Sequence, residues 1–558
     1  MNLKKVTPRF FVSEQIHPHD IGLAAAQGIK TIICNRPDHE TAGQPEAQSV
    51  ADAAAALGID FIHMPVSSGR VTDHNVSDFS KAYKSVKGPI LAYCRSGMRC
   101  TTLWALTEAE LLDVNTIMST AMDAGYDLKG LRPRLEARIE EAQGRNVAAS
   151  TPDRHDVVIV GGGAGGIATA ASLLKRDSGL DILIIEPCDT HYYQPGFTMV
   201  GGGIFDAEKT ERTMASVMPD RVKWKKAAVA DFEPQSNCII LEDGTRVAYR
   251  VLVAAPGLKL DWEAVDGLVD SLGKNGVTSN YLFEMAPYTW SLVEGFESGR
   301  AVFTQPRMPI KCAGAPQKAM YLSCDHWLKR NRLDAIEVDF RNAGPVLFGV
   351  ADYVPALMKY VDKYGINLCC NENLVAVDGA AQKAWFDRTA EDGATTRVEV
   401  GFDILHVCPP QTAPDFIKNG PLANEAGWID VAQDTLQHTK FGNVFAVGDA
   451  HSAPNAKTAA AVRNQAPVVA ENVISTLAGS DPHRKYDGYG SCPLTVERGK
   501  IVLAEFGYGG KHLPTFPQWI INSYEPSRIA WMLKRNLLPP VYWKFLLKGR
   551  EWLITPME

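Results

Sequence analysis

Short apolar runs alternate with amphipathic segments along most of the chain, and this pattern predicts an α/β fold. The runs TIICN (31–35), DFIHMPV (60–66) and PILAYC (89–94) have the length of strands, and AQSVADAAAAL (47–57) has helical spacing. The same alternation starts again with HDVVIV at residue 155. Strands that alternate with helices favour parallel sheets, so we predict two successive α/β parts.

A change of composition separates these two parts. The charged segment GLRPRLEARIEE (130–141) predicts a helix, and AQGRNVAASTPDR (142–154) has the small and polar residues of a linker. We therefore predict an N-terminal domain over residues 1–141, a linker over 142–154 and a larger unit from residue 155 onward.

Composition narrows the class of protein. With 46% hydrophobic residues and a net charge of −7, the 558-residue chain is typical of a globular protein and gives no support for nucleic-acid binding. The start lacks the apolar run of a signal peptide, and no run of about 18 apolar residues predicts a spanning helix. The 11 cysteines show no CxxC and no zinc spacing, so we expect reduced thiols in a cytoplasmic protein and no metal site.

The chemistry of the N-terminal part is predicted to lie in ILAYCRSGMRCTTLWAL (90–106). Cys94 ends an apolar strand, and the turn after it opens a helix. The backbone N–H groups of such a turn form a site for an anion. This field, together with Arg95 and Arg99, is expected to lower the pKa of Cys94 and to favour the nucleophilic thiolate.

The spacing after Cys94 separates two chemistries. Cysteine-dependent phosphatases place an arginine six residues after the cysteine, where this chain has Cys100; Arg99 closes a shorter loop, as in rhodaneses, which carry sulfane sulfur. With FFVSEQI (10–16) and NRPDHE (35–40), the segment resembles the phosphatase-like domain attached to some beta-lactamase-like sulfur dioxygenases. A sulfurtransferase and a phosphatase both stay open. Lesser candidates are an acid in a loop, for which solvation is the favoured interpretation, and two histidines in a surface turn: Asp38, His17 and His19.

The larger unit opens with a dinucleotide fingerprint. The strand pattern VVIV (157–160) precedes a glycine-rich turn and a helical pattern, and the next strand, DILIIE (181–186), ends in an acid. This arrangement predicts a pyrophosphate on the helix N-terminus and ribose hydroxyls on the acid. The candidate cofactor-binding residues are Gly161, Gly163, Ala164, Gly166 and Glu186.

Two later segments indicate FAD rather than a nicotinamide. VLVAAPGL (251–258), with Gly257, and GNVFAVGDA (442–450), with Gly448, resemble the later contacts of FAD oxidoreductases. The second resemblance implies that Asp449 bonds the ribityl chain. A helical pattern follows from Lys457 and Thr458, and its positive end is expected to stabilise the reduced flavin.

The middle of the larger unit lacks the second fingerprint that a nicotinamide would require. A strand pattern, RAVFTQP (300–306), leads into MPIKCAGAPQKAMYL (308–322), where Pro309 and Pro316 crowd the turn. A pyrophosphate needs glycines for close backbone approach, so NAD(P)H is disfavoured as the electron donor. We expect Cys312 to react with a sulfur nucleophile on one side and with the flavin on the other.

Several segments resemble sulfide:quinone oxidoreductases, in particular the branch with the mitochondrial enzyme: HYYQPGFTMVGGG (191–203), PIKCAGAPQKAMYLS (309–323), TLQHTKFGNVFAVGD (435–449) and YDGYGSCPL (486–494). The resemblance implies tandem Rossmann-like folds, with an FAD-binding part over 155–275 and 402–480 and a second part over 276–401. It also implies that Cys312 takes up sulfide sulfur and that FAD passes electrons to a quinone.

The chain departs from this family at one position. The resemblance implies a second redox cysteine directly after the GD signature, where the chain has Ala450. Cys408 is a candidate substitute, although packing at a strand end is the favoured interpretation. Packing is also favoured for the remaining candidates, Cys188, Cys324, Cys369, Cys370 and Cys492.

The C-terminal region, residues 481–558, is predicted to contact a membrane. RIAWMLKRNLLPPVYWKFLLKGREWLI (528–554) mixes aromatic and aliphatic residues with lysine and arginine, and two prolines divide it into pieces too short to span a bilayer. Such a segment suits the membrane interface. The alternative is a helical hairpin packed on the domain.

Together these features predict an FAD enzyme at the cytoplasmic side of the inner membrane. It would oxidise sulfide with a membrane quinone as acceptor, and the N-terminal part would pass persulfide sulfur to a small thiol such as glutathione. Two alternatives stay open: an NAD(P)H-driven flavin disulfide or persulfide reductase, and a non-catalytic sulfide or redox sensor in which Ala450 marks lost turnover.

Overall fold

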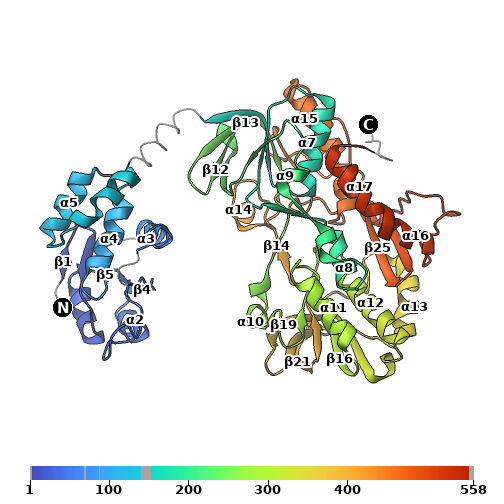
Figure 1. Ribbon diagram of the computed structural model, residues 1–558, viewed down its shortest axis with the longest axis horizontal. Coiled ribbons are helices and arrows are strands. Elements are labelled where there is room, and N and C mark those ends of the chain that lie inside the picture. Colours follow the sequence, from blue (N-terminus) through green and yellow to red (C-terminus); the bar gives the residue numbers. More distant parts are fainter. Residues whose placement is uncertain (1–2, 68–70, 87, 140–151, 552–558) are drawn as a thin grey trace. The chain divides into compact units, whose positions relative to one another are not determined.

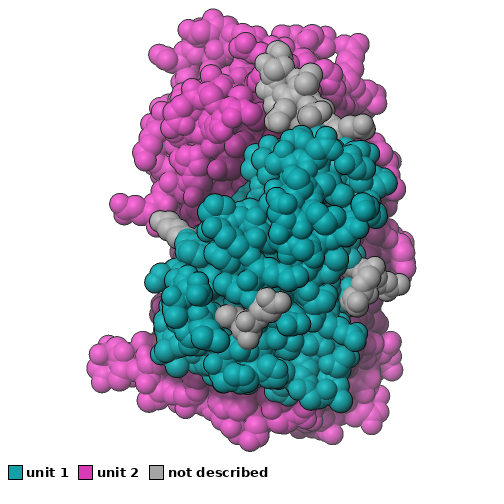
Figure 2. Space-filling view, turned by 90° about the vertical axis from the view of Figure 1, so that its left-hand side faces the viewer, with its two compact units in different colours: residues 1–151 teal, residues 152–558 magenta. Residues whose placement is uncertain are grey.

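The computed structural model describes residues 3–67, 71–86, 88–139 and 152–551. The chain divides into two compact units, residues 1–151 and 152–558 (Figure 2). The predicted linker lies mostly outside the described residues. Its last two residues, Asp153 and Arg154, already belong to the first strand of the second unit.

The first unit is a mainly parallel sheet with helices on both faces (Figure 1). Ile33 and Ala92 pack in the cluster that holds α3 and α4, whereas Ile32 and Leu91 pack with α1 and α2, because neighbouring strand residues face opposite sides. The α/β prediction for this unit is confirmed. In sheet order its strands are β1 (Lys4–Lys5), β2 (Phe10–Ser13), β5 (Ile90–Tyr93), β3 (Thr31–Cys34) and β4 (Asp60–His63); its helices include α1 (Ile21–Ala26), α2 (Ala47–Ala55), α3 (Asp73–Ser85), α4 (Met98–Glu108) and α5 (Val114–Asp123).

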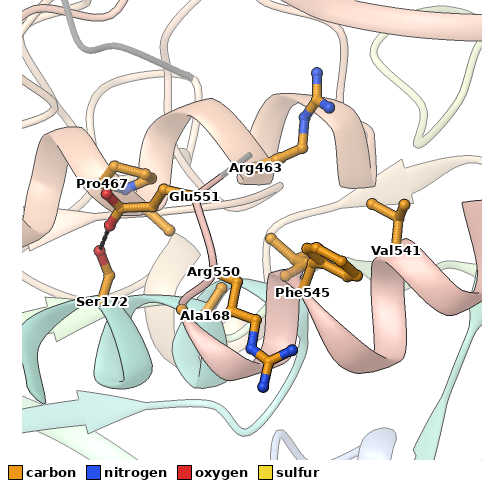
Figure 3. A pocket seen from close by; sticks show the side chains of 11 residues that line it. Ala168, Ser172, Arg463, Pro467, Val541, Phe545, Arg550 and Glu551 are labelled. Atoms are coloured by element: carbon orange, nitrogen blue, oxygen red, sulfur yellow. Dashed lines mark hydrogen bonds between the residues drawn. The ribbon is translucent and has the colours of Figure 1, made fainter. Parts of the chain in front are cut away.

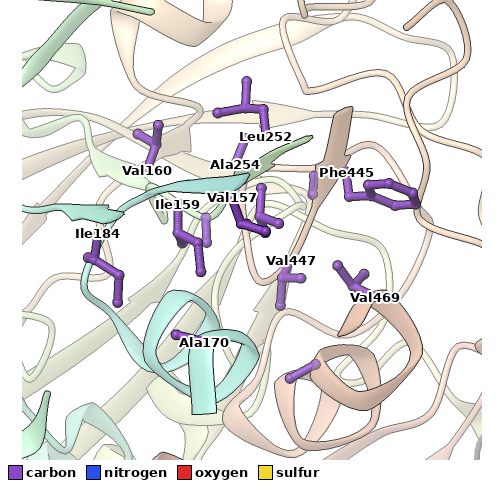
Figure 4. Packing of buried hydrophobic residues seen from close by; sticks show 14 of the residues in the cluster. Val157, Ile159, Val160, Ala170, Ile184, Leu252, Ala254, Phe445, Val447 and Val469 are labelled. Carbon is purple, nitrogen blue, oxygen red and sulfur yellow. The ribbon is translucent and has the colours of Figure 1, made fainter. Parts of the chain in front are cut away.

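The second unit begins with a sheet whose parallel strands carry its core. Val157 and Ile159 of one strand and Phe445 of another pack with Ala170 and Val469, which come from the two helices over this face (Figure 4). The strands run in the order β10 (Lys223–Lys225), β7 (Ile182–Ile185), β6 (Asp153–Val160), β13 (Arg246–Ala254), β12 (Cys238–Leu241) and β11 (Val229–Glu233), with β24 (Val444–Ala446) also on β13; the two helices are α7 (Ala164–Arg176) and α15 (Ala459–Leu477).

A second parallel sheet forms the middle of this unit. Its strands run in the order β15 (Val277–Thr278), β22 (Ile404–His406), β16 (Gly299–Gln305), β17 (Ile336–Asn342) and β18 (Asn367–Cys370), and its helices are α11 (Met285–Gly295), α12 (Ala315–Lys329) and α13 (Val354–Tyr364). The predicted tandem fold is confirmed, but one boundary is displaced. The predicted return to the first part at residue 402 is too early, because β22 pairs with β16.

Smaller elements complete the second unit. They are β8 (Thr190–Tyr192) with β9 (Glu211–Thr213), β14 (Lys259–Leu260) with β23 (Gln411–Thr412), the sheet of β19 (Glu372–Asp378), β20 (Lys383–Thr389) and β21 (Thr395–Gly401), and the short helices α8 (Phe197–Val200), α9 (Met214–Val217), α10 (Leu268–Ser271) and α14 (Asp415–Lys418). The hairpin of β25 (Gly490–Glu497) and β26 (Lys500–Phe506) packs on α12, although it lies within the predicted membrane-interface region.

The C-terminal segment holds α16 (Arg528–Met532), a π-helical stretch (Leu533–Leu537) and α17 (Leu538–Lys544). Its end is fastened to α7, because Glu551 accepts a hydrogen bond from Ser172 at 2.6 Å (Figure 3). Glu551 also pairs with Arg176 and Lys175. A small pocket lies between this segment, α7 and α15, and the guanidinium groups of Arg463 and Arg550 point away from each other there (Figure 3). Among the described residues, no helix is long and apolar enough to cross a membrane.

Candidate functional site

The glycine-rich turn between β6 and α7 has the shape of a dinucleotide cradle. Gly161 has a φ of +102°, and a Cβ there would overlap the carbonyl oxygen of Ala255. A Cβ on Gly166 would overlap the carbonyl oxygen of Gly161, so this glycine lets the helix approach the turn. By contrast, a Cβ on Gly163 would meet no protein atom within 4 Å. The open space beside Gly163, at the N-terminus of α7, fits the close approach of a pyrophosphate.

The acid at the end of the next strand faces this turn. Glu186, directly after β7, accepts hydrogen bonds from the backbone N–H of Gly162 at 2.7 Å and of Cys188 at 2.8 Å. Its carboxylate is therefore held beside the predicted pyrophosphate site, as ribose recognition requires. Ala164 begins α7 and Gly257, with a φ of +74°, follows β13, so both predicted positions lie at strand ends or turns of the first sheet.

The late signature carries a partly buried aspartate, Asp449, and is followed by a buried lysine, Lys457, just before α15. Lys457 donates hydrogen bonds to the backbone oxygens of Asp449, at 2.6 Å, and His451, at 3.1 Å. Burial lowers the pKa of Lys457 to about 8 and raises the pKa of Asp449. Thr458 caps α15 by accepting a hydrogen bond from Ala461 N–H at 3.2 Å. Gly448 donates its N–H to Gln465 at 2.9 Å, which closes the turn on the helix. Polar groups of these residues thus surround the predicted flavin site.

Cys312 lies in the turn between β16 and α12, next to this signature. Its backbone N–H donates to the carbonyl oxygen of Lys457 at 2.8 Å, and the preceding N–H, of Lys311, donates to Gln411 at 2.7 Å. The Lys318 ammonium, one turn into α12, donates to Cys312 Sγ at 3.0 Å. The turn is therefore anchored to the start of α15, and the thiol has a cation beside it.

The thiol of Cys492 lies against that of Cys312. Cys492, on β25, is fully buried in the core cluster against which Cys312 packs. The neighbouring Cys492 thiol, as a hydrogen-bond donor, and then the charge of Lys318 hold the pKa of Cys312 well below its usual value. The same interaction, with burial, raises the pKa of Cys492. Of the two thiols, Cys312 therefore has the lower pKa and Cys492 the higher.

Cys492 is the residue that sequence reasoning missed. Packing was the favoured interpretation, and Cys492 does lie in a core cluster, but it also contacts the predicted nucleophile. Its segment, Tyr486–Leu494, was among those that carry the family resemblance, and a cysteine within such a segment was the available signal. Ala450, at the position where the second cysteine was expected, is fully buried.

Cys408 lies on the other side of Cys312 in a small apolar cluster. Burial raises the pKa of Cys408 to about 12, and its thiol donates to the carbonyl oxygen of Pro409 at 3.8 Å. Gln411 also donates to its Sγ, at 3.8 Å. The surroundings of Cys408 are those of a protonated, packed thiol. The structure brings Cys408 near Cys312 but engages its sulfur elsewhere.

The N-terminal unit presents a second reactive thiol at the end of β5. Cys94 Sγ accepts a hydrogen bond from the N–H of Gly97 at 3.2 Å, in the predicted anion-binding turn. The thiol of Cys100 and further backbone N–H groups of the turn lower the pKa of Cys94 to about 5, although burial opposes the shift. The predicted thiolate therefore has a structural basis in the turn itself.

The two arginines act differently from the prediction. Arg99 donates to the carbonyl oxygen of Val66 at 2.5 Å and to Glu40 at 2.7 Å, so its guanidinium is occupied, while Arg95 is exposed. Among the main causes of the low pKa of Cys94, Arg99 contributes through its backbone N–H and not through its guanidinium charge, and Arg95 does not contribute. Asp38 accepts a hydrogen bond from the N–H of Ala47 at 2.8 Å, at the start of α2.

The fold and the two cysteine sites define a class: a two-dinucleotide-domain flavoprotein with a thiol pair in its middle domain, joined to a domain with a cysteine loop. The chain is 40% identical over 398 residues to "Sulfide:quinone oxidoreductase, mitochondrial" from Dictyostelium discoideum, covering 71% of this chain and 86% of that protein. The chain therefore belongs to the sulfide:quinone oxidoreductase family, whose members are FAD-dependent flavoproteins. The predicted cofactor, FAD, is confirmed.

A solved structure agrees with this assignment, and the N-terminal part of the chain matches a different family. The sulfide:quinone oxidoreductase from Aquifex aeolicus has the same fold, with a TM-score of 0.59 and 18% identity over 72% of this chain and 92% of that one. Residues 2–111 match the family model of the beta-lactamase hydrolase-like protein phosphatase-like domain. In that region the chain is 35% identical over 109 residues to the Beta-lactamase hydrolase-like protein from Agrobacterium fabrum, which covers 20% of this chain and 25% of that protein.

Exchanging single glycines should separate cofactor binding from folding. Gly163→Ala should yield a folded protein with reduced FAD content, because its Cβ enters only the space left for the cofactor. Gly161→Ala should also lower the melting temperature, because its Cβ overlaps Ala255 and its φ disfavours a side chain. Absorbance at the flavin band and thermal unfolding measure both effects. Equal melting temperatures for the two variants would contradict this difference.

Proposed function

We propose that the chain oxidises sulfide to sulfane sulfur and passes the electrons to a quinone. The observation that carries this proposal is the pair of Cys312, in the turn where a nicotinamide fingerprint would otherwise stand, and Cys492, on β25. Membership of the family supports the same substrates. The sensor alternative assumed that the protein lost its second redox cysteine because Ala450 stands in its place. Cys492 is a candidate for that second thiol.

The two pKa directions assign a role to each cysteine. In the oxidised pair, hydrosulfide attacks the sulfur of Cys492 and expels the Cys312 thiolate, because the thiol with the lower pKa is the better leaving group. The S–S bond between the cysteines breaks, and a new S–S bond forms a persulfide on Cys492. Lys318 stabilises the departing thiolate at 3.0 Å. In this scheme the sulfane sulfur is first bound to Cys492, whereas the sequence had suggested Cys312.

The cycle closes when a small thiol such as glutathione takes the sulfane sulfur and leaves two reduced cysteines. FAD, when bound, would supply the two-electron acceptor for reoxidation of the pair and the link to the quinone. The residues that would hold it are the glycine turn at 161–166, Glu186 and the late signature around Asp449 and Lys457. Cys312 is placed for this step by its backbone bond to Lys457.

Anaerobic titration of the purified holoprotein tests this function. Sulfide should bleach the flavin band, and a short-chain quinone should restore it, whereas NADH should leave the band unchanged. The reason is that the β16–α12 turn presents Cys312 instead of a glycine cradle. Bleaching by NADH with no response to sulfide would overturn the proposal and support the reductase.

The role of the N-terminal unit follows from Cys94. A thiolate with a pKa of about 5 in a nest of N–H groups suits the acceptance of sulfane sulfur and its transfer to a small thiol such as glutathione. Cys100 stands where a phosphatase requires arginine, which favours sulfur transfer over phosphate hydrolysis.

The C-terminal segment supports a peripheral position on a membrane, at the cytoplasmic side of the inner membrane. Ile529 and Met532 of α16 are 53% and 61% exposed, and Trp519, in the adjoining loop, is 86% exposed. Residues of that loop pack on α16 in one cluster. All 11 cysteines are free thiols, which suits a reducing compartment. The segment is also packed on the domain, so both sequence interpretations apply to it.

Introducing negative charge on this apolar surface should release the protein from membranes. The double variant Ile529→Glu and Met532→Glu should bind vesicles of phosphatidylethanolamine and phosphatidylglycerol at least about tenfold more weakly, because two apolar contacts are lost and charge is added. Cosedimentation measures the change. Leu111→Glu, at a position that is 76% exposed in the first unit, is the matched control. Unchanged binding of the folded double variant would remove this surface from the proposal.

A further inference from the structure

Two buried thiols meet beneath the anion-binding turn of the first unit. Cys94 directly follows β5, and Cys100 is in the first turn of α4. Both are fully buried in the same core cluster, and the neighbouring Cys100 thiol is the first cause of the lowered pKa of Cys94. The turn between them is tightly held, because a Cβ on Gly97 would overlap the hydroxyl of Tyr126. The two sulfurs therefore share one side of the sheet and one short loop.

The third cysteine of this unit provides a contrast. Cys34 ends β3 and packs in the cluster on the opposite face of the sheet. Its thiol donates to the carbonyl oxygen of Arg36 at 3.4 Å and is also hydrogen-bonded to Tyr93. Cys34 is as buried as Cys100 but its sulfur is directed to other partners. Among the three cysteines of this unit, only Cys100 shares the buried cluster of Cys94.

The states of the two thiols are complementary. Cys94 is the thiolate, and burial together with the neighbouring Cys94 raises the pKa of Cys100. Cys94 therefore reacts first with a sulfur electrophile. Once its sulfur is bonded to an incoming group, the negative charge beside Cys100 is gone, and Cys100 loses one cause of its raised pKa. Cys100 becomes a better nucleophile at the moment when an S–S bond lies next to it.

We propose that Cys100 is the resolving thiol of Cys94. The Cys94 thiolate attacks a low-molecular-weight disulfide or persulfide, forms a mixed disulfide Cys94–S–S–R and releases the partner thiolate. Cys100 then attacks Cys94 Sγ: the S–S bond of the mixed disulfide breaks, the Cys94–Cys100 disulfide forms, and the R–S group leaves as the thiol R–SH with the proton of Cys100. The two cysteines are oxidised by two electrons, and the small disulfide or persulfide is reduced.

With Cys100 beside it, a sulfur atom bound to Cys94 can be removed by two reactions. A sulfane sulfur can pass to an external thiol, or Cys100 can expel it as hydrosulfide and close the loop as a disulfide. The closed form has no thiolate to accept sulfur, and a small dithiol reopens it by exchange. The inference builds on the proposed role of Cys94, but its test uses glutathione disulfide alone, so its outcome is independent of sulfide oxidation.

The test follows the disulfide in the full-length holoprotein. Reduced protein is treated with glutathione disulfide, blocked with N-ethylmaleimide at low pH and digested with trypsin. Cleavage after Arg95 and Arg99 separates the peptides that carry Cys94 and Cys100 unless a disulfide joins them. We expect the joined peptides in the wild type. In Cys100→Ser, whose hydroxyl keeps a hydrogen-bond donor, the Cys94 peptide should instead retain glutathione.

Matched thiols control the experiment. Cys34→Ser should still give the joined peptides, because Cys34 lies on the other face of the sheet. Cys188, which is exposed, should retain glutathione in every sample. If Cys100→Ser fails to fold, Cys94→Ser serves in its place, and Cys100 should then take up no glutathione. A stable Cys94–glutathione adduct in the wild type, no reaction at Cys94, or a bond from Cys94 to Cys34 would each overturn the proposal.

Discussion

Replacing Cys492 by serine should reduce sulfide:quinone turnover by on the order of 10³-fold or more, while FAD stays bound. The loss is large because the thiol takes part in covalent chemistry: without Cys492 the oxidised pair cannot form, and hydrosulfide finds no S–S bond to attack. FAD should remain because Cys492 lies on β25, over α12, and not in the glycine turn or the late signature.

Two buried cysteines provide matched controls for this variant. Cys324, in α12, is fully buried in the same core cluster as Cys492, and burial without a second thiol beside it raises its pKa. Cys408 is near Cys312, but its sulfur donates to Pro409 and accepts from Gln411. Serine at either position should change turnover by less than about tenfold, through packing alone. If Cys408→Ser abolishes turnover and Cys492→Ser does not, the assignment of the second redox thiol is wrong.

Local patterns were sufficient to predict much of the fold. The β6–turn–α7 unit follows from an apolar run, glycines at fixed spacing and a helical stretch, all within one short segment. The displaced boundary has a different origin. β22 has three residues, Ile404–His406, and so short a run does not indicate which of two sheets it joins. Its pairing with β16 is a contact between distant parts of the chain, which a local pattern does not contain.

The candidate site also has residues that the local sequence predicts and residues that it does not. Cys312 could be predicted because an unusual residue stands in a recognisable strand-to-helix turn. Its partner could not, because Cys492 arrives from a hairpin far along the chain and meets Cys312 only through packing on α12. Arg99 shows the opposite error: its place in the loop was predicted, but Glu40, from a distant segment, occupies its guanidinium. The reactive residue in a turn could thus be predicted from the sequence, whereas its contacts with residues from distant segments could not.

The charge on Lys318 should set the pH at which Cys312 becomes reactive. Lys318→Met removes the ammonium that lies 3.0 Å from Cys312 Sγ. An adjacent cation favours the thiolate, so its loss raises the pKa of Cys312 and leaves less thiolate at every pH below the new midpoint. Alkylation of Cys312 by iodoacetamide near pH 6 should slow by on the order of tenfold, and the rate should recover as the pH rises.

A second lysine makes this test specific. Lys534 also lies close to the pair, but its ammonium donates to the carbonyl oxygen of Pro493 at 3.2 Å and to Thr495 at 2.9 Å, and burial holds its pKa well below its usual value. Because Lys534 is less charged near neutral pH, Lys534→Met should move the alkylation profile less than Lys318→Met, and Lys318→Arg should keep most of the wild-type profile. Mass spectrometry of the Cys312 peptide across a pH series measures each rate. An unshifted profile in a folded, flavin-loaded Lys318→Met protein would show that the hydrogen bond from Cys492, rather than the cation, keeps Cys312 ionised.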